Sequence, residues 1–221
     1  MNARAFIFDA YGTLFDVHAA IAHYRKRIGP DADRISEVWR TKQLEYTWTL
    51  TAMNRYENFE RLTERALDFA LARHEKNDPA LRADLLAAYR ELNAYPDAKD
   101  ALHALKQSGK TTGILSNGSP EMLQAAVDAA GIGGVLDHVL SVDVLRIYKP
   151  RQEVYALVTK ALSVQPEEIV FVSSNRWDVA GAAGFGFKPV WVNRSKMPDE
   201  YADLAPVATL DSLAALSALE L

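Results

Sequence analysis

Two kinds of hydrophobic spacing divide the chain. An apolar run at Phe6, Ile7 and Phe8 ends in Asp9, which indicates a buried strand followed by a polar turn. From about residue 17 to residue 92 the apolar positions instead recur at helical spacing, with no convincing strand. From residue 98 onward, helical segments alternate with short apolar runs. This alternation predicts a parallel α/β sheet with an all-helical block inserted after its first strand.

Breaking residues and helix caps give the expected element boundaries. Gly29-Pro30 ends a first helix, Pro79 suits the first position of another, and Ser119 suits an N-cap. We expect helices over residues 35–52, 59–73, 79–92, 98–108, 120–130 and 153–162. We expect strands over residues 6–8, 112–115, 138–141, 169–172 and 190–192. Residues 173–178 have the composition of a polar loop, and the Ala/Leu-rich tail from residue 204 favours a final helix.

The predicted fold class is α/β, with a Rossmann-like, doubly wound, mostly parallel sheet as the core and an inserted all-helical cap subdomain. We expect residues 1–16 and 93–221 to form the core and residues 17–92 to form the cap. In open sheets of this class the carboxyl ends of the strands face one crevice. The cap is therefore expected to lie over these strand ends.

Composition narrows the classes of function. The chain has 221 residues, 49% of them hydrophobic, which is enough for one core domain with an insert. Its formal net charge of −4 and lack of a basic run disfavour a nucleic-acid partner. Cysteine is absent, which excludes disulfides and thiol catalysis and fits a reducing compartment. With no signal-peptide pattern and no apolar stretch long enough to cross a bilayer, we expect a cytoplasmic protein that binds no membrane.

Polar residues follow four of the predicted strands. One such residue is more often ordinary turn chemistry than a ligand, but four strand ends in succession favour a common site. An aspartate carboxylate can form a covalent ester, so Asp9 is a candidate nucleophile. The candidate site residues at these strand ends are Asp9, Thr13, Ser116, Asn117, Lys149, Ser173, Asn175 and Asp178.

Four segments carry a resemblance to a known family. Residues 8–15, 115–118, 148–150 and 172–178 resemble the four motifs of the haloacid dehalogenase superfamily. Together with the helical stretch 38–48, they are similar more narrowly to the L-2-haloacid dehalogenases. The resemblance extends from about residue 4 to residue 192. It implies a small-molecule haloacid substrate, a halide product and a homodimer.

The resemblance also implies a mechanism. Asp9 would attack the α-carbon of a short-chain L-2-haloalkanoic acid and expel halide, and water would then hydrolyse the Asp9 ester. A single displacement at the stereocentre would give the D-2-hydroxy acid with inversion. Lys149 would keep Asp9 ionised and help bind the substrate carboxylate, while Thr13, Ser173 and Asn175 would orient Asp9. Asp178 would position or activate the hydrolytic water.

The remaining roles implied by the resemblance concern substrate and halide. Ser116 with nearby backbone N–H groups would bind the substrate carboxylate, and Arg40 would reach the halide from the cap. The other residues expected to contact substrate are Ala10, Tyr11, Phe59, Asn117, Tyr155 and Trp177.

Several structural alternatives stay open for these residues. Lys149 could be a surface lysine before a proline, and Arg40 a solvated helix residue. Asp178 could cap a helix that starts near Val179. Tyr155 could be a buried structural tyrosine, and Phe59 and Trp177 could be core aromatics. The five histidines lack metal-ligand spacing and are interpreted as structural or surface residues.

Leaving-group chemistry favours halide over phosphate. A phosphatase must protonate an alkoxide, whereas a halide is the anion of a strong acid and needs no proton. Tyr11 occupies the position where the superfamily's phosphatases would carry a second acid, and Ser174 is neutral where they would hold Mg²⁺ with a carboxylate. We therefore expect no metal and no cofactor. The alternatives are a magnesium-dependent phosphatase of the same superfamily and a catalytically silent binding protein. A phosphatase assay with and without Mg²⁺ tests the first, and the presence of Asp9, Lys149 and Asp178 argues against the second.

Overall fold

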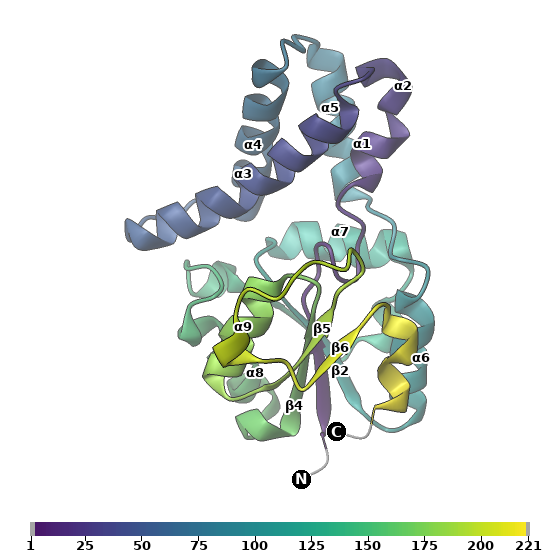
Figure 1. The fold of residues 1–221 in the computed structure, drawn as a ribbon, viewed down its shortest axis with the longest axis vertical. Helices are drawn as coiled ribbons and strands as arrows, with labels where there is room; N and C mark the ends of the chain where they lie inside the picture. Colours follow the sequence, from purple (N-terminus) through teal and green to yellow (C-terminus); the bar gives the residue numbers. More distant parts are fainter. Residues whose placement is uncertain (1–2, 220–221) are drawn as a thin grey trace.

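A six-stranded parallel sheet forms the centre of the computed structural model, which describes residues 3–219 (Figure 1). The sheet order is β3-β2-β1-β4-β5-β6, with β1 between β2 and β4. The strands are β1 (Ala5–Phe8), β2 (Thr111–Ser116), β3 (His138–Ser141), β4 (Ile169–Ser173), β5 (Lys188–Val192) and β6 (Ala208–Leu210). The predicted parallel α/β core is confirmed, and Asp9 follows the strand at its centre.

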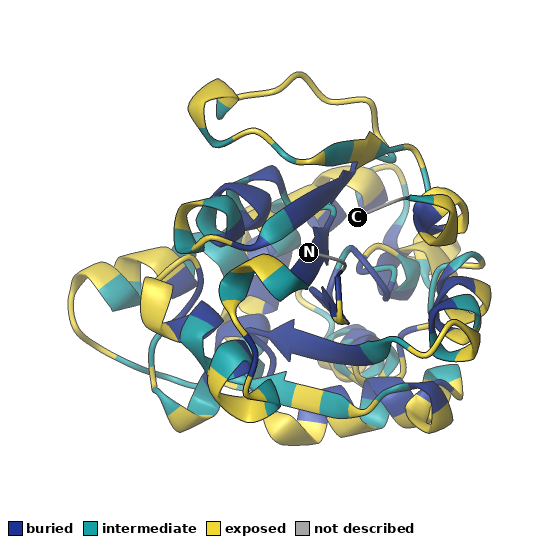
Figure 2. Ribbon diagram, turned by 90° about the horizontal axis from the view of Figure 1, so that it is seen from below, coloured by how far each residue is buried: buried dark blue, intermediate teal, exposed yellow. Residues whose placement is uncertain are grey.

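The inner strands are covered by helices on both sides, which explains their continuous apolar runs. Every residue of β1 and β4 is buried, whereas β3 at the sheet edge is half-exposed (Figure 2). In Figure 1, α6 lies on one side of the sheet, with α8 and α9 on the other. The flanking helices are α6 (Ala98–Gln107), α7 (Pro120–Ala130), α8 (Gln152–Leu162) and α9 (Arg176–Phe185).

Five helices form a separate block above the carboxyl edge of the sheet (Figure 1). The side chains of Asn58 and Asp78 cap α4 and α5, and the Trp39 indole donates a hydrogen bond to the Thr63 carbonyl (2.9 Å) between α3 and α4. Among residues 3–219, no helix is both long enough and apolar enough to cross a membrane. The helices of this block are α1 (Ala19–His23), α2 (Arg25–Ile28), α3 (Ala32–Ala52), α4 (Phe59–Arg73) and α5 (Pro79–Arg90).

The chain passes into and out of the helical block through two adjacent segments. Phe15 and Ala94 form an antiparallel bridge. The Asp16 N–H donates to the Asn93 carbonyl (3.1 Å), and the Tyr95 N–H donates to the Leu14 carbonyl (2.8 Å). The block is therefore joined to the core by a short paired linker.

A second set of contacts, here called the clasp, ties the α3–α4 connection to the loop before Lys149. The Tyr148 hydroxyl donates to the Glu57 carbonyl (2.6 Å), and the Tyr148 N–H donates to the Thr51 hydroxyl (3.3 Å). The Tyr56 ring stacks on Tyr148 with centroids 5.3 Å apart, and the Tyr56 hydroxyl bonds to Asp143. The helical block is thus also held over the sheet by contacts outside the linker.

Two sequence predictions differ from the structure. The expected helix in the tail is wrong: residues 208–210 pair with β5 as β6, residues 213–218 form a short 3₁₀ helix, and residues 220–221 lie outside the described residues. Pro206 lacks an N–H and interrupts the helical pattern, so pairing at the sheet edge decides this segment. Residues 173–178 are also not all loop, because α9 begins at Arg176.

The clasp predicts a measurable contribution to stability. Tyr148→Phe removes the hydroxyl that reaches Glu57, and we expect it to lower the free energy of unfolding by about 1 kcal/mol and Tm by about 2–4 °C. Calorimetry measures the change. Tyr24→Phe is the control, because that half-buried cap tyrosine makes no hydroxyl hydrogen bond within the described chain. Equal Tm changes in the two variants would contradict a role for the clasp.

Candidate active site

The turn after β1 places Asp9 at the centre of the carboxyl edge. The Asp9 N–H continues the sheet by donating to the Val172 carbonyl (2.9 Å). The chain then reverses at once: the N–H groups of Thr13 and Phe15 both donate to the Ala10 carbonyl (3.2 and 3.0 Å). Gly12 permits this reversal with φ of +94°, a conformation that other residues rarely adopt. Asp9 is thereby presented from a rigid, buried turn.

Both oxygens of the Asp9 carboxylate accept hydrogen bonds. Oδ1 accepts from Lys149 Nζ (3.1 Å), and Oδ2 accepts from the Thr13 hydroxyl (3.1 Å) and Asn175 Nδ2 (2.8 Å). The Ser173 hydroxyl lies 3.5 Å from Oδ2, which is a long hydrogen bond compared with the other three. The Thr13 hydroxyl itself accepts from the Ser174 N–H (2.8 Å), so its proton is directed at Asp9. The carboxylate is held in one orientation.

Lys149 lies between two buried carboxylates. Its Nζ donates to Asp9 and also to Asp178 Oδ2 (2.8 Å), and its side chain is only 1% exposed. Burial opposes the charged ammonium, but the charges of Asp178 and Asp9 outweigh it and raise the pKa of Lys149. The Lys149 N–H donates to Asn117 Oδ1 (3.1 Å), which fixes the loop. The alternative of a surface lysine is wrong.

Asp178 belongs to this cluster and does not cap α9. The N-cap residue is Asn175, and Asp178 lies within the first helical turn. Its Oδ1 accepts from the Tyr155 hydroxyl (2.7 Å). Burial and the nearby charge of Asp9 raise the pKa of Asp178 to about 6, although Lys149 and Tyr155 act in the opposite direction. Tyr155 is fully buried, as the structural alternative expects, and its hydroxyl contacts a candidate site residue.

The segment after β2 forms the neighbouring side of the crevice. The buried Ser116 hydroxyl accepts from the Gly118 N–H (3.0 Å), and the Ser119 side chain caps α7 by accepting from the Met122 N–H (3.3 Å). A Cβ on Gly118 would lie 2.7 Å from Cε2 of Tyr11, so glycine allows the Tyr11 ring to rest against this backbone. Ser116 makes no direct contact with Asp9 among the hydrogen bonds of residues 3–219.

Arg40 reaches down from α3 of the helical block toward this turn. Its Nη2 donates to the Tyr11 carbonyl (2.9 Å), and it forms no ion pair among the described residues. The Tyr11 ring is buried against Phe59, with centroids 5.8 Å apart, and Phe59 also contacts Tyr148 (6.4 Å). Burial raises the pKa of Tyr11 well above its usual value, so its phenol is neutral. Phe59 and Tyr11 thus form an aromatic wall beneath the helices.

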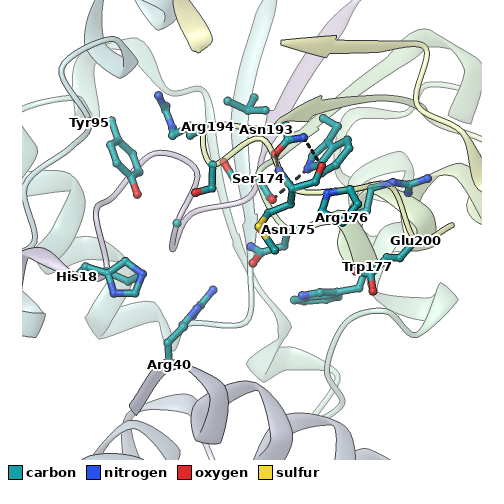
Figure 3. A pocket seen from close by; sticks show the side chains of 17 residues that line it. His18, Arg40, Tyr95, Ser174, Asn175, Arg176, Trp177, Asn193, Arg194 and Glu200 are labelled. Carbon is teal, nitrogen blue, oxygen red and sulfur yellow. Dashed lines mark hydrogen bonds between the residues drawn. The ribbon is translucent and has the colours of Figure 1, made fainter. Parts of the chain in front are cut away.

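A cleft of about 410 Å³ opens between the helical block and the sheet edge (Figure 3). Arg40 points into it from below in this view, and Asn175 and Trp177 border the opposite side. Trp177 is half-buried and meets Trp48 of α3 edge-to-face at 5.4 Å. Asn175 links the cleft to the cluster, because its Nδ2 bonds Asp9.

Other residues of this cleft were not identified from the sequence. Arg194 follows β5 and pairs with Asp97 (2.7 Å), and Tyr95 lies close to its guanidinium, 4.1 Å from ring centroid to Cζ. Arg194 comes two residues after β5 (Lys188–Val192), so it too is a polar residue that follows a strand end and could have been identified from the sequence. His18 also lines the cleft and contacts the Ser36 hydroxyl (2.7 Å), a position that no local sequence signal indicates.

The cluster does not suit a magnesium ion. Mg²⁺ requires several oxygen ligands in octahedral geometry. Here the Lys149 ammonium sits between Asp9 and Asp178, and Ser174 offers a neutral hydroxyl. Within residues 3–219 no group of three or more His, Asp or Glu side chains could hold a metal ion. The cation between the two carboxylates belongs to the protein itself.

Fold and site together define a hydrolase class in which an aspartate follows the central strand of a parallel sheet beneath a helical insert. Residues 3–186 match the haloacid dehalogenase-like hydrolase family. The chain therefore belongs to this family. It is 48% identical to the (S)-2-haloacid dehalogenase 4A of Burkholderia cepacia over 93% of this chain and 89% of that protein. It is also 48% identical to the (S)-2-haloacid dehalogenase 1 of a Pseudomonas species (strain CBS-3), over 98% and 96%.

Solved structures agree with this relationship. A crystal structure of a dehalogenase superposes with a TM-score of 0.97 at 46% identity, covering 99% of this chain and 98% of the other. The L-2-haloacid dehalogenase of Xanthobacter autotrophicus with chloropropionic acid covalently bound superposes with a TM-score of 0.90 at 38% identity, covering 98% of each chain. The helical block above the sheet is thus the cap of a known architecture.

The position of Lys149 predicts a change in the protonation of Asp178. Lys149→Met removes the ammonium that lowers the pKa of Asp178, so this pKa should rise further above its value of about 6. The infrared carboxyl band, followed through a pH titration, measures it. Lys160→Met, an exposed lysine on α8, is the control. An unchanged Asp178 titration in the Lys149 variant would contradict the cluster geometry.

Proposed function

We propose that the protein hydrolyses short-chain L-2-haloalkanoic acids to D-2-hydroxy acids, with inversion, through an ester on Asp9. The observation that carries the proposal is the Asp9 carboxylate held on both oxygens by Lys149, Thr13 and Asn175. Similarity to (S)-2-haloacid dehalogenases supports the substrate class. The covalently bound chloropropionic acid in the relative from Xanthobacter autotrophicus supports a covalent route.

In the first step an Asp9 oxygen forms a bond to the substrate α-carbon as the carbon–halogen bond breaks and halide leaves with its electron pair. Nucleophile and substrate are both anions, and unit charges about 4 Å apart repel by about 4 kcal/mol at an effective dielectric near 20. Lys149 offsets this repulsion and keeps Asp9 ionised. Thr13, Ser173 and Asn175 orient the carboxylate for attack from behind the leaving group.

Substrate and halide are bound by residues on both sides of the site. Ser116 and the backbone N–H groups near the start of α7 bind the substrate carboxylate, where the helix dipole favours an anion. Arg40 receives the departing halide, since guanidinium is weakly hydrated and always charged. The remaining proposed substrate contacts are Ala10, Tyr11, Phe59, Asn117, Tyr155 and Trp177.

In the second step water attacks the carbonyl carbon of the Asp9 ester. Asp178 accepts one proton from this water, and the other proton of the water passes to the alkoxide oxygen as the ester C–O bond breaks, which releases the hydroxy acid and restores the Asp9 carboxylate. Tyr155 and Lys149 hold Asp178 in place through both of its oxygens. The alternative of a magnesium-dependent phosphatase is disfavoured by neutral Tyr11 and Ser174 and by the Lys149 ammonium between the carboxylates.

We further propose that the chain is divided into a core and a cap, that it forms a homodimer and that it acts in the cytoplasm. The paired linker at Phe15 and Ala94 supports a core of residues 1–16 and 93–221 with a cap of residues 17–92. Exposed Trp48, Met53 and Phe69 on the cap support a homodimer formed through this surface. The absence of cysteine supports action in the cytoplasm.

A single turnover in ¹⁸O-labelled water, with enzyme in excess over 2-chloropropionate, tests the covalent route. Water attacks the ester carbonyl, so the label should enter the Asp9 carboxylate while the hydroxy acid stays unlabelled. Mass spectrometry of the Asp9 peptide and of the product measures both. Asp9→Asn should abolish turnover, and Ser195→Ala at the outer cleft is the control. Label found directly in the product would exclude the ester.

Asp178 gives the ester-hydrolysis step a defined pH dependence. Its pKa is about 6 while Asp9 is charged, and esterification removes the Asp9 charge that raises this pKa. The pKa in the ester should then lie below 6. Because the carboxylate must be ionised to accept a proton, ester hydrolysis should be constant above about pH 6 and should fall in more acidic solution.

Rapid-quench experiments at a series of pH values between about 4.5 and about 8 measure the rate of ester hydrolysis. Asp178→Asn should form the ester and fail to hydrolyse it, so that the protein mass increases by the bound acid. A hydrolysis rate that still rises above neutral pH would indicate a different base.

A further inference from the structure

The end of β3 lies beside the turn that is proposed to bind the substrate carboxylate. β3 pairs with β2 in parallel, and the register places Ser141, the last residue of β3, opposite Ser116, the last residue of β2. The turn after β2, residues 116–118, leads into α7 through its N-cap, Ser119. Because neighbouring parallel strands end at the same edge of a sheet, Ser141 is a close neighbour of the substrate site.

The Ser141 hydroxyl links this turn to the loop that follows β3. It donates to the Gly118 carbonyl (2.7 Å) and accepts from the Asp143 N–H (3.1 Å). The Gly118 N–H in turn donates to the Ser116 hydroxyl (3.0 Å). These directions are defined, since a backbone N–H can only donate and a carbonyl can only accept. In the described chain the Ser116 proton is given to no protein acceptor, so it can be donated to a bound carboxylate.

Helix capping alone does not account for this arrangement. Ser141 is the N-cap of the short 3₁₀ helix Val142–Val144, which explains only the bond from the Asp143 N–H. The bond to Gly118 joins two segments that are 23 residues apart. The Asp143 side chain bonds to Tyr56 of the clasp, so the loop after Ser141 is itself anchored to the cap. One hydroxyl therefore ties the turn to a loop that the cap holds in place.

We propose that Ser141 is a positioning residue that holds the Ser116–Gly118 turn in the conformation that binds the substrate carboxylate. The proposal rests on the function inferred above, in which Ser116 and the N–H groups near the start of α7 bind this carboxylate. The Gly118 carbonyl and the Ser119 N–H belong to one planar peptide group, so a bond that fixes the first also fixes the second. Glycine has more backbone freedom than other residues, and an external bond is therefore needed to hold this peptide.

A well-ordered turn should affect binding more than chemistry. The carboxylate stays in the turn before and during the displacement at the α-carbon, so the contact is similar in the ground state and the transition state. An interaction of equal strength in both states changes the affinity for substrate and leaves the rate at saturation unchanged. Loss of the Ser141 hydroxyl should thus weaken substrate binding with little effect on the limiting rate of ester formation.

Ser141→Ala tests the proposal, since it removes only the hydroxyl. Halide release from 2-chloropropionate in single turnovers, at a series of enzyme concentrations, gives the half-saturating concentration and the limiting rate. The half-saturating concentration should rise about fivefold, as expected for one lost hydrogen bond, and the limiting rate should change less than about twofold. Propionate, which carries the carboxylate but no halogen, should inhibit about fivefold less well, and inhibition by bromide should be unchanged.

Two variants are the controls. Ser141→Thr keeps the hydroxyl on a residue that is suited to a strand, and it should behave like the unsubstituted protein. Ser108→Ala removes a hydroxyl that also donates to a carbonyl, that of Leu105 (2.8 Å), but that lies between α6 and the start of β2. The Ser108 variant should leave substrate affinity and propionate inhibition unchanged.

The ratio of propionate to bromide inhibition separates positioning from stability. A lower Tm in Ser141→Ala with unchanged propionate inhibition would overturn the proposal and leave a structural role, as would an equal loss of inhibition by both anions. Should Ser141→Ala fail to fold, Ser141→Cys decides by the same ratio, because a thiol is a weak donor. Failure of the proposed function is distinct, because the unsubstituted protein would then release no halide.

Discussion

The buried Lys149 ammonium between Asp9 and Asp178 is the interaction on which the site depends. Two carboxylates that are almost wholly inaccessible to water could not both stay ionised without a cation between them. The strands β1 and β4 bring the two aspartates to one edge, and Asn117 at the end of β2 holds the Lys149 loop. The order of the parallel sheet thus assembles a charged cluster from distant segments, and that cluster favours an aspartate nucleophile.

The same cluster explains why this site suits halide better than phosphate. A protein cation replaces the metal that would neutralise a phosphoryl group, and the side chain two residues after Asp9 is a neutral, buried tyrosine. Tyr11 packs on Phe59 and Tyr89 of the cap and closes the floor beneath it. A halide carries away its own charge and needs no proton. The step that releases halide therefore needs no general acid, and the Tyr11 ring adds an apolar wall to the site.

Much of the site could be predicted because parallel sheets align their strand ends. Polar residues after successive strands had to converge, which located Asp9, Asn117, Lys149 and Asp178 at one edge. The same rule extended to β5 would have added Arg194. Arg40 could be assigned only by resemblance, since a charged residue on a helix carries no local sign of the direction it faces. Ser141 ends a predicted strand, but its bond to the Gly118 carbonyl depends on how β3 pairs with β2.

The sequence by itself determined the class of fold, the limits of most helices and the candidate nucleophile, because hydrophobic spacing and turn residues act over a few neighbouring positions. It did not determine the tail, where pairing with β5 overrides a helix-favouring composition. Only the tertiary structure decided the protonation of Asp178, the direction of Arg40 and the cleft they serve. These properties depend on burial and on distances between residues far apart in the chain, which spacing along a sequence does not contain.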